Sequence, residues 1–322
     1  MIPIKKYIKV FFFFISTILA VSTVCVAVSD FNEEDFLMDI LWRKVELAKL
    51  EERPKVALVL GGGGARGISH IGVLRVISEE HIPIDVVIGT SVGSITGAFF
   101  CAGVPFDSLD DLAKTIGIKD VSNYSYPSLI SMFLNENLLS NENLENLINK
   151  IIGDIRFDQL KIQLICIATD LNTGERILLR EGSVAFAARA SSTIPGIFKP
   201  VEYMQRYLVD GGLAENIPVN VAKIFGADVI IAVSVSADIT KNNTANIFFT
   251  LMQAMYIQGM ILDQYNLNMA DVVICPDVGS LSVLDFKEAH KTIDKGFIAS
   301  KRVVKNIKKV IINKMMEKYL LE

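Results

Sequence analysis

Cysteine is rare in this sequence: 322 residues contain four, and Cys25 lies in an apolar N-terminal run. The other three, Cys101, Cys166 and Cys275, each have apolar neighbours. An odd number of cysteines in such surroundings excludes a framework of disulfides. We expect all three to be small, buried hydrophobic side chains.

Positively charged residues are also fewer than negatively charged ones. Lys and Arg number 32 against 36 Asp and Glu, which gives a formal net charge of −4. Because nucleic-acid binding needs a clustered basic surface, this balance excludes nucleic acid as the main partner. No loop has the acidic spacing of an EF-hand, so nothing indicates a calcium site. Hydrophobic residues make up 51% of the chain, which is ample for a large buried core.

The first 29 residues have the pattern of a targeting segment. Three lysines between residues 5 and 9 precede an uncharged stretch at 10–28, and acidic residues follow from Asp30. The basic flank predicts that the rest of the chain crosses the cytoplasmic membrane. Small residues before Asp30 fit a cleaved signal peptide, whereas the length of the stretch also suits a retained anchor. We therefore expect an exported, periplasmic or otherwise extracytoplasmic protein, or one anchored by this segment.

The main part of the chain, residues 54–300, alternates short β-branched runs with helical patterns, and no repeat or linker divides it. This alternation predicts one α/β domain with a mainly parallel central sheet covered by helices. Residues 30–53 predict an amphipathic helix that leads into it, and residues 122–149 a cap or helical insertion. The expected strands are 56–60, 85–89, 164–169, 207–209 and 228–236; the expected helices are 68–80, 92–102 and 218–225.

Ser91 is the candidate nucleophile. It is the centre of Gly-Thr-Ser-Val-Gly at 89–93, between a predicted strand and a predicted helix. This is the setting of a nucleophile elbow, in which Gly89 and Gly93 leave room for a strained turn. The serine oxygen then lies at the helix N-terminus, where the helix dipole favours negative charge. The alternative is a glycine-rich turn with an incidental serine.

A run of four glycines at 61–64 follows the first predicted strand. Such a loop presents several backbone N–H groups at one point, as the oxyanion of a tetrahedral intermediate requires. Gly62, Gly63 and Gly64 are the candidate donors, and Arg66 is the candidate residue that orients the loop.

The same loop satisfies a second pattern, because Gly62, Gly64 and Gly67 have the Gly-x-Gly-x-x-Gly spacing of dinucleotide sites. That pattern also needs an acidic residue at the end of the next strand. Asp85 is at about the right distance along the sequence from the glycine loop, but it lies at the start of the next predicted strand and not at its end. The nucleotide-binding alternative therefore fails at its most specific requirement.

A serine nucleophile needs a base, and the chain has three histidines. His70 falls inside a predicted helix and His81 in a loop before a proline. His290 follows Asp210, so a triad in the order serine–acid–histidine is formally available. Nothing around His290 indicates an active-site loop.

Asp210 has a better setting for the base, because it ends an apolar run and is followed by Gly211 and Gly212. Ligands of open parallel sheets collect at the carboxyl ends of the strands, and we place both Asp210 and Ser91 there. An aspartate bonded to the serine would act as the base of a two-residue dyad. The alternative is an ordinary turn aspartate.

Three segments, in this order, resemble the patatin-like phospholipase family: Gly-Gly-Gly-Ala-Arg-Gly at 62–67, Gly-Thr-Ser-Val-Gly at 89–93 and Asp-Gly-Gly at 210–212. The resemblance extends to residues 168–174 and 189–196, and covers about residues 54–300. It implies a three-layer α/β/α fold with a mainly parallel sheet and a Ser91–Asp210 dyad without histidine. It also implies that residues 189–195 support the site structurally.

The resemblance implies an enzyme of the phospholipase A or lysophospholipase type. Ser91 would attack the acyl carbonyl, Asp210 would take its proton, and the Gly62–Gly64 amides would hold the oxyanion. The expected substrate is a phospholipid or lysophospholipid, with no cofactor and no metal; the oligomeric state is left open. Two alternatives remain: a catalytically silent lipid-binding protein, and an acyltransferase that uses the same acyl-enzyme.

Residues 301–322 predict a basic amphipathic helix, with Lys and Arg on one face and Val and Ile on the other. Such a helix lies on an anionic membrane surface, or docks on the core with its lysines in solvent. A second apolar stretch, residues 248–256, either lines an acyl pocket or belongs to the core.

Overall fold

The computed structural model describes most of the chain, namely residues 33–122, 138–235, 247–283 and 285–321. The predicted targeting segment, residues 1–29, and part of the predicted cap, residues 123–137, lie outside the described residues. The chain divides into two compact units, residues 1–40 and residues 41–322, and the sheet belongs to the second. Among the described residues, no helix is both long enough and apolar enough to span a membrane.

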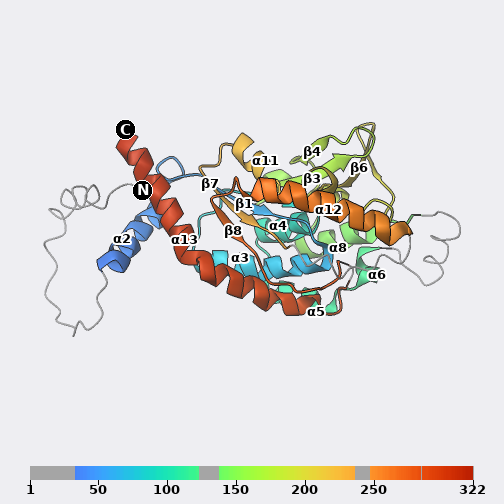
Figure 1. Ribbon diagram of the computed structural model, residues 1–322, viewed down its shortest axis with the longest axis horizontal. Coiled ribbons are helices and arrows are strands. Elements are labelled where there is room, and N and C mark those ends of the chain that lie inside the picture. Colours follow the sequence, from blue (N-terminus) through green and yellow to red (C-terminus); the bar gives the residue numbers. More distant parts are fainter. Residues whose placement is uncertain (1–32, 123–137, 236–246, 284, 322) are drawn as a thin grey trace. The chain divides into compact units, whose positions relative to one another are not determined.

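A β-sheet forms the middle of the second unit, with the order β5-β6-β3-β2-β1-β7-β8 and with β4 paired to β3 (Figure 1). The run β3-β2-β1-β7-β8 is parallel, whereas β4, β5 and β6 pair in antiparallel fashion. The central strands read as continuous apolar runs because both faces are covered. The strands are β1 (Val56–Leu60), β2 (Val86–Thr90), β3 (Gln163–Asp170), β4 (Arg176–Leu179), β5 (Val201–Tyr203), β6 (Arg206–Asp210), β7 (Val229–Val233) and β8 (Val272–Ile274).

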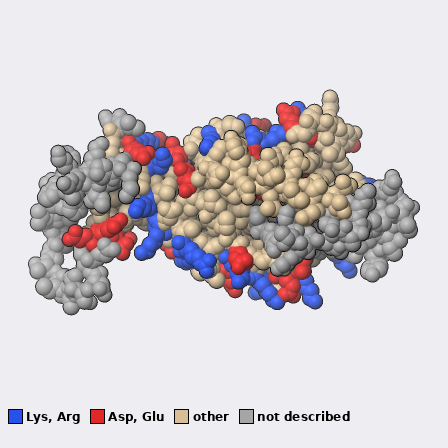
Figure 2. Space-filling view, in the orientation of Figure 1, with Lys and Arg blue, Asp and Glu red and all other residues tan. Residues whose placement is uncertain are grey.

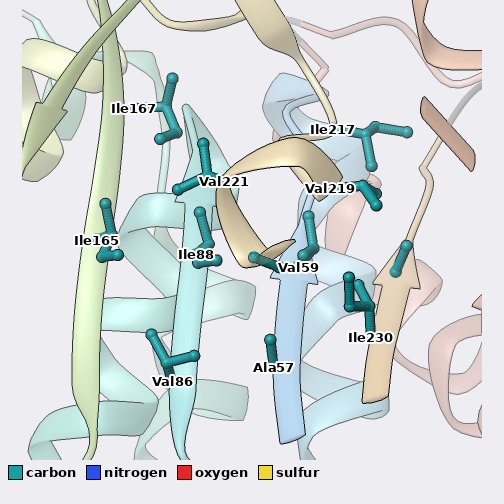
Figure 3. Close-up of a cluster of buried hydrophobic side chains, with 12 residues drawn as sticks. Ala57, Val59, Val86, Ile88, Ile165, Ile167, Ile217, Val219, Val221 and Ile230 are labelled. Carbon is teal, nitrogen blue, oxygen red and sulfur yellow. The ribbon is translucent and has the colours of Figure 1, made fainter. Parts of the chain in front are cut away.

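Helices cover both faces of this sheet. Alternate side chains of β1, β2, β3 and β7 point towards α11 (Val219–Ile224) and form a buried cluster with it (Figure 3). On the other face, Gly97 of α4 (Val92–Ala102) lies against the side chains of Leu60, Val87 and Leu164. The predicted three-layer α/β/α fold is therefore confirmed.

The remaining helices connect or flank these layers. The predicted leading helix is α2 (Glu33–Leu47), and the expected helix 68–80 begins as a 3₁₀ turn, η1 (Gly64–Ile68), before α3 (Ser69–Glu79). The others are α5 (Phe106–Thr115), α6 (Ile118–Val121), α8 (Glu142–Ile152), η2 (Phe157–Gln159), α9 (Val184–Ser191), α10 (Gly212–Glu215), α12 (Ile247–Leu267), η4 (Ala289–Lys291) and α13 (Thr292–Leu321).

The direction of β6 differs from the sequence-based expectation. We had placed Asp210 at the carboxyl edge of a parallel sheet, but β6 runs antiparallel to β3, with Asp210 opposite Ala168. β2 ends with Thr90 opposite Ile167. Asp210 and Ser91 therefore reach the same level of the sheet because β6 stops partway along β3, and not because two parallel strands end together.

The cysteines also differ from expectation at one position. Cys101 and Cys166 are buried, as predicted, whereas Cys275 is exposed. β8 ends at Ile274, so the Cys275 side chain lies just beyond the last covered residue of the strand.

The C-terminal helix α13 begins at Thr292, before the predicted boundary at residue 301, and docks on α3. The two backbones touch at glycines: a Cβ on Gly72 would lie 2.0 Å from the Ile293 carbonyl oxygen, and one on Gly296 would lie 1.9 Å from that of Ser69. The apolar side chains of α13 are buried against the core, among them Val304, Ile307, Ile311, Ile312 and Met315.

Ion pairs connect α13 to the end of α3. Lys301 and Lys308 each lie 2.8 Å from the Glu80 carboxylate on the neighbouring helix. The sequence left two alternatives for this helix, lying on a membrane surface or docking on the core. The structure shows it docked on the core.

We predict that Gly72→Ala destabilises the fold by about 2 to 3 kcal/mol, because the added methyl group meets the backbone of α13. Gly259→Ala on α12 is the matched control, since nothing lies within 4 Å of its Cβ position. It should be neutral or stabilise the protein by up to about 1 kcal/mol. Urea unfolding of the two variants measures both effects; equal stabilities would contradict the close packing of α3 and α13.

Candidate active site

Ser91 occupies a strained turn between β2 and α4. Its backbone has φ 54° and ψ −126°, which is a left-handed conformation that a non-glycine residue rarely adopts. The turn leaves no room for side chains beside it, because a Cβ on Gly93 would lie 2.1 Å from the Leu60 carbonyl oxygen. A Cβ on Gly89 would lie 2.5 Å from that of Gly93. The structure thus shows the predicted elbow geometry.

A pair of buried hydroxyl groups holds this turn in place. The Ser91 N–H donates to Ser191 Oγ at 2.9 Å, and Ser191 Oγ donates to the Ile167 carbonyl oxygen at 2.5 Å. Ser94 Oγ lies 2.7 Å from both Ser191 Oγ and the Gly89 carbonyl oxygen. The sequence indicated a supporting role for residues 189–195, but neither the particular contact of Ser191 nor that of Ser94.

Asp210 lies at the end of β6, buried beside Ser91. The Gly212 N–H donates to its carboxyl group at 2.8 Å. Burial raises the pKa of Asp210 to about 6, although the Ser91 side chain and the Gly212 N–H both lower it. Gly211 lies tightly against β3, since a Cβ there would be 2.2 Å from the Ile167 carbonyl oxygen.

The glycine loop approaches Ser91 from the end of β1. Gly61 N–H donates to Val233 O at 3.1 Å. Gly62 N–H is shared between Asn216 Oδ1 at 3.1 Å and the Asn216 carbonyl oxygen at 3.4 Å. Within the described part of the chain, the N–H groups of Gly63 and Gly64 donate to no other protein group. Of the three expected oxyanion donors, Gly62 is therefore already engaged, and Gly63 and Gly64 are available.

Arg66 lies in the same loop and is 6% exposed. Its Nε donates to the Leu281 carbonyl oxygen at 2.7 Å, which ties the loop to the segment before η4. Burial lowers the pKa of Arg66, and the nearby Tyr256 phenol opposes that shift. No carboxylate of the described residues pairs with its guanidinium group.

A cavity of about 170 Å³ opens between the glycine loop, Ser91, Asp210 and α12. Most of its lining is apolar, and the apolar side chains come from α12 and from four other segments: Ile194, Pro195, Leu213, Val235, Met255, Met260, Leu262 and Val283. Part of the predicted apolar stretch 248–256 thus faces the site, through Met255 and Tyr256. The side chains of Phe248, Phe249 and Met252 lie outside the described residues.

None of the three histidines lines this cavity. His81 is exposed, and His290 belongs to η4. His70 is buried behind the glycine loop, where burial lowers its pKa to about 4 and keeps the ring neutral. Its Nε2 lies 2.8 Å from the Gly61 carbonyl oxygen, an acceptor, so the ring proton is on Nε2. His70 supports the loop that leads to the site.

The nucleotide-binding alternative finds no support in this geometry. Asp85 lies at the opposite end of β2 from the glycine loop, where it forms a bidentate ion pair with Arg53 at 2.7 Å. A Cβ on Gly67 would lie 2.1 Å from a Val92 methyl carbon, so that glycine serves the packing of η1 on α4. Among the described residues, no three His, Cys, Asp or Glu side chains cluster as metal ligands.

The sequence profile of the patatin-like phospholipase family matches residues 58–223, which include Ser91, Asp210 and the glycine loop. The match covers about half of the chain, and the chain belongs to this family.

Two relatives illustrate the range of the family. An uncharacterized NTE family protein of Mycobacterium tuberculosis is 34% identical over 183 residues, which are 57% of this chain and 49% of that protein. Patatin-like phospholipase domain-containing protein 7 of Rattus norvegicus is 32% identical over 199 residues, 59% of this chain and 14% of that protein. The chain thus spans about half of the mycobacterial relative and a smaller part of the animal one.

Solved structures with a related arrangement include VipD of Legionella pneumophila and human GIVD cytosolic phospholipase A2. VipD is 15% identical with a TM-score of 0.46, and the match covers 79% of this chain and 67% of VipD. The human protein is 11% identical with a TM-score of 0.46, and the match covers 88% of this chain and 65% of that one.

We predict that Asp210→Asn stabilises the protein at alkaline pH. The folded pKa of about 6 lies above the ordinary aspartate value of 3.8, so burying the charged carboxylate destabilises the fold above pH 6 and has no effect well below pH 3.8. A neutral amide should therefore add about 1 to 3 kcal/mol at alkaline pH and little at acidic pH. Urea unfolding at about pH 8 and about pH 4 measures the difference.

Asp111→Asn is the control for that comparison, because the Asp111 side chain is 79% exposed. It should change stability by less than about 0.5 kcal/mol at either pH. An Asp210→Asn gain that is equally large at both pH values would show that the carboxylate is not destabilised by its burial.

Proposed function

We propose that this protein is a serine acyl-ester hydrolase that acts on lipids, of the phospholipase A or lysophospholipase type. One observation carries the proposal: Ser91 and a buried carboxyl group whose pKa is about 6, that of Asp210, line the same apolar cavity, and the Ser91 side chain acts on that pKa. A base with a pKa slightly below neutral is ionised at physiological pH and still basic enough to take a proton. The family to which the chain belongs supports the same assignment.

The reaction follows from these positions. Ser91 Oγ attacks the acyl carbonyl carbon while its proton passes to the Asp210 carboxylate, and the carbonyl oxygen becomes an oxyanion. The free N–H groups of Gly63 and Gly64 donate to that oxyanion, with the N-terminus of α4 adding its dipole. The ester bond then breaks, and the leaving alcohol takes the proton from Asp210.

Water completes the cycle. Asp210 takes a proton from water as the water oxygen attacks the acyl-enzyme, and a second oxyanion forms at the same loop. Ser91 then leaves and recovers its proton, which releases a fatty acid. An acyltransferase would use an alcohol in place of water at this step, so product analysis distinguishes the two. A silent lipid-binding protein would bind lipid without either step.

We predict that Ser91→Ala and Asp210→Asn each lower kcat/KM on a p-nitrophenyl ester and on a lysophospholipid by at least about 10³-fold. His290→Ala should stay within about twofold of the wild type, because a dyad needs no histidine. A loss of activity in His290→Ala equal to that in Asp210→Asn would contradict the dyad. A folded wild type that hydrolyses neither substrate would favour the silent alternative.

We also propose that the protein works on a membrane surface, which it approaches through α12. From Ile247 to Leu262 this helix carries no charged residue. Several of its side chains are exposed beside the cavity, Ile261 by 65% and Tyr265 by 68%. Figure 2 shows mostly uncharged atoms over α12, whereas charged side chains gather along α13. The N-terminal segment, residues 1–29, supports export to, or anchorage at, the outer face of the cytoplasmic membrane.

We predict that Ile261→Glu and Tyr265→Glu each weaken binding to neutral phosphatidylcholine vesicles about tenfold, because each removes an apolar side chain from the lipid surface. Ile298→Glu on α13 is the matched control, since Ile298 is 46% exposed on the other helix. Hydrolysis of a water-soluble short-chain ester should be unchanged in all three. Co-sedimentation measures the binding; a requirement for anionic lipid that salt abolishes would instead implicate the α13 lysines.

A further inference from the structure

Asn216 links the glycine loop to α12. It follows α10, a few residues after Asp210, and its Oδ1 accepts a hydrogen bond from the Gly62 N–H at 3.1 Å. Its Nδ2 donates to Asp263 Oδ2 on α12 at 2.8 Å. A chain of two hydrogen bonds therefore runs from an acidic side chain on a helix to the backbone of the loop.

Asp263 determines the orientation of the Asn216 side-chain amide. A carboxamide has a donor end and an acceptor end of nearly the same shape, and its hydrogen-bond partners decide its orientation. A carboxylate accepts only, so the NH₂ end of Asn216 must face Asp263. That leaves the oxygen end to face the Gly62 N–H, for which it is the nearer acceptor, at 3.1 Å against 3.4 Å for the Asn216 main-chain oxygen.

The buried carboxylate of Asp263 destabilises the fold. It is 5% exposed, and no Lys or Arg of the described residues pairs with it. Burial raises its pKa to about 6, with the Asn216 hydrogen bond and the Ile217 N–H opposing the shift and the Glu215 carboxylate adding to it. A neutral side chain at this position would avoid burying a charge.

The link acts on the distance between the loop and the nucleophile. Gly62 sits between Asn216 and Ser91: a Cβ on it would lie 2.5 Å from Asn216 Oδ1 and 3.1 Å from Ser91 Cβ. Because Gly62 is held in this gap, the positions of the next two residues, Gly63 and Gly64, are restricted as well. Their N–H groups donate to no other protein group within the described part of the chain. A loop released from Asn216 would move those donors relative to the Ser91 oxygen.

We propose that Asp263 is a positioning residue, which orients the Asn216 amide so that it holds the glycine loop against Ser91. The proposal rests on the function proposed above, because the loop matters to catalysis only if its N–H groups bind an oxyanion. Misplacing such donors by about 1 Å weakens the transition state more than the bound substrate. The expected signature is therefore a fall in kcat with little change in KM.

The chain offers a matched control on the same helix. Asn266 lies about one turn further along α12 and is 6% exposed, nearly as buried as Asp263. Its Nδ2 donates to Glu215 Oε1 at 3.3 Å, so it ties α12 to the same turn of the chain without touching the loop. Asn266→Ala removes a buried polar contact of similar kind and leaves the Asn216 amide in place.

The first arm of the experiment is hydrogen exchange of the loop, which needs no enzymatic activity. In Asp263→Ala, the amide protons of the peptide that covers residues 60–66 should exchange about tenfold faster than in the wild type. In Asn266→Ala they should exchange at the wild-type rate. Equal exchange in the two variants would overturn the proposal, even if the protein hydrolysed no ester at all.

The second arm is steady-state hydrolysis of a water-soluble p-nitrophenyl ester. Asp263→Ala should lower kcat about 30- to 100-fold with KM within about twofold of the wild type. Asp263→Asn keeps an acceptor oxygen for Asn216 and should restore kcat to within about threefold. Asn266→Ala should keep the wild-type kcat. A kcat in Asp263→Asn as low as in Asp263→Ala would overturn the role of the acceptor.

Discussion

The proposed mechanism depends on one constraint: a carboxyl group must lie beside the Ser91 side chain, buried from water, and among the described residues no Lys or Arg forms an ion pair with Asp210. Two groups favour the charged form of Asp210: the Gly212 N–H, which donates to its carboxyl group at 2.8 Å, and the Ser91 side chain, which lowers its pKa. They compensate only part of the cost of burial, because the pKa of Asp210 is still raised to about 6. Because its pKa stays raised, the Asp210 carboxylate is basic enough to take a proton near neutral pH.

The segment from Asp210 to Asn216 connects the parts of the site. Its Gly212 N–H binds the Asp210 carboxyl group, and its Glu215 carbonyl oxygen accepts from Thr90 Oγ1 at 3.2 Å, directly before the proposed nucleophile, Ser91. At its end, Asn216 binds the glycine loop. One short turn of chain thus contacts the acid, the nucleophile strand and the loop. Their relative positions depend on a few hydrogen bonds within a rigid sheet, as preorganised electrostatic stabilisation requires.

Local patterns predicted much of this arrangement. The elbow around Ser91 and the strand Val56–Leu60 depend on residues within a few positions of one another, so both could be recognised from the sequence. The direction of β6 could not, because it depends on pairing with β3, some forty residues earlier in the chain. Cys275 was misjudged for a related reason: an apolar neighbourhood in sequence does not reveal where the strand ends.

The link through Asn216 and Asp263 was also beyond the sequence analysis. An asparagine before a proline-containing turn and an acid near the end of a helix are ordinary residues, and only the fold brings them together. A signal did exist, because Asp263 is the sole charged residue of α12. A lone acid in an otherwise uncharged helix marks a position where a charge has a specific partner.

The most direct test of the account is covalent labelling of the wild-type protein with a fluorophosphonate, followed by mass spectrometry of the labelled peptide. We expect one adduct, on Ser91, with a labelling rate that rises with pH and is half-maximal near the Asp210 pKa of about 6. A folded protein that forms no adduct, or forms it on another residue, would contradict the assignment of the nucleophile. A labelling rate that does not change between about pH 5 and about pH 8 would contradict the assignment of the base.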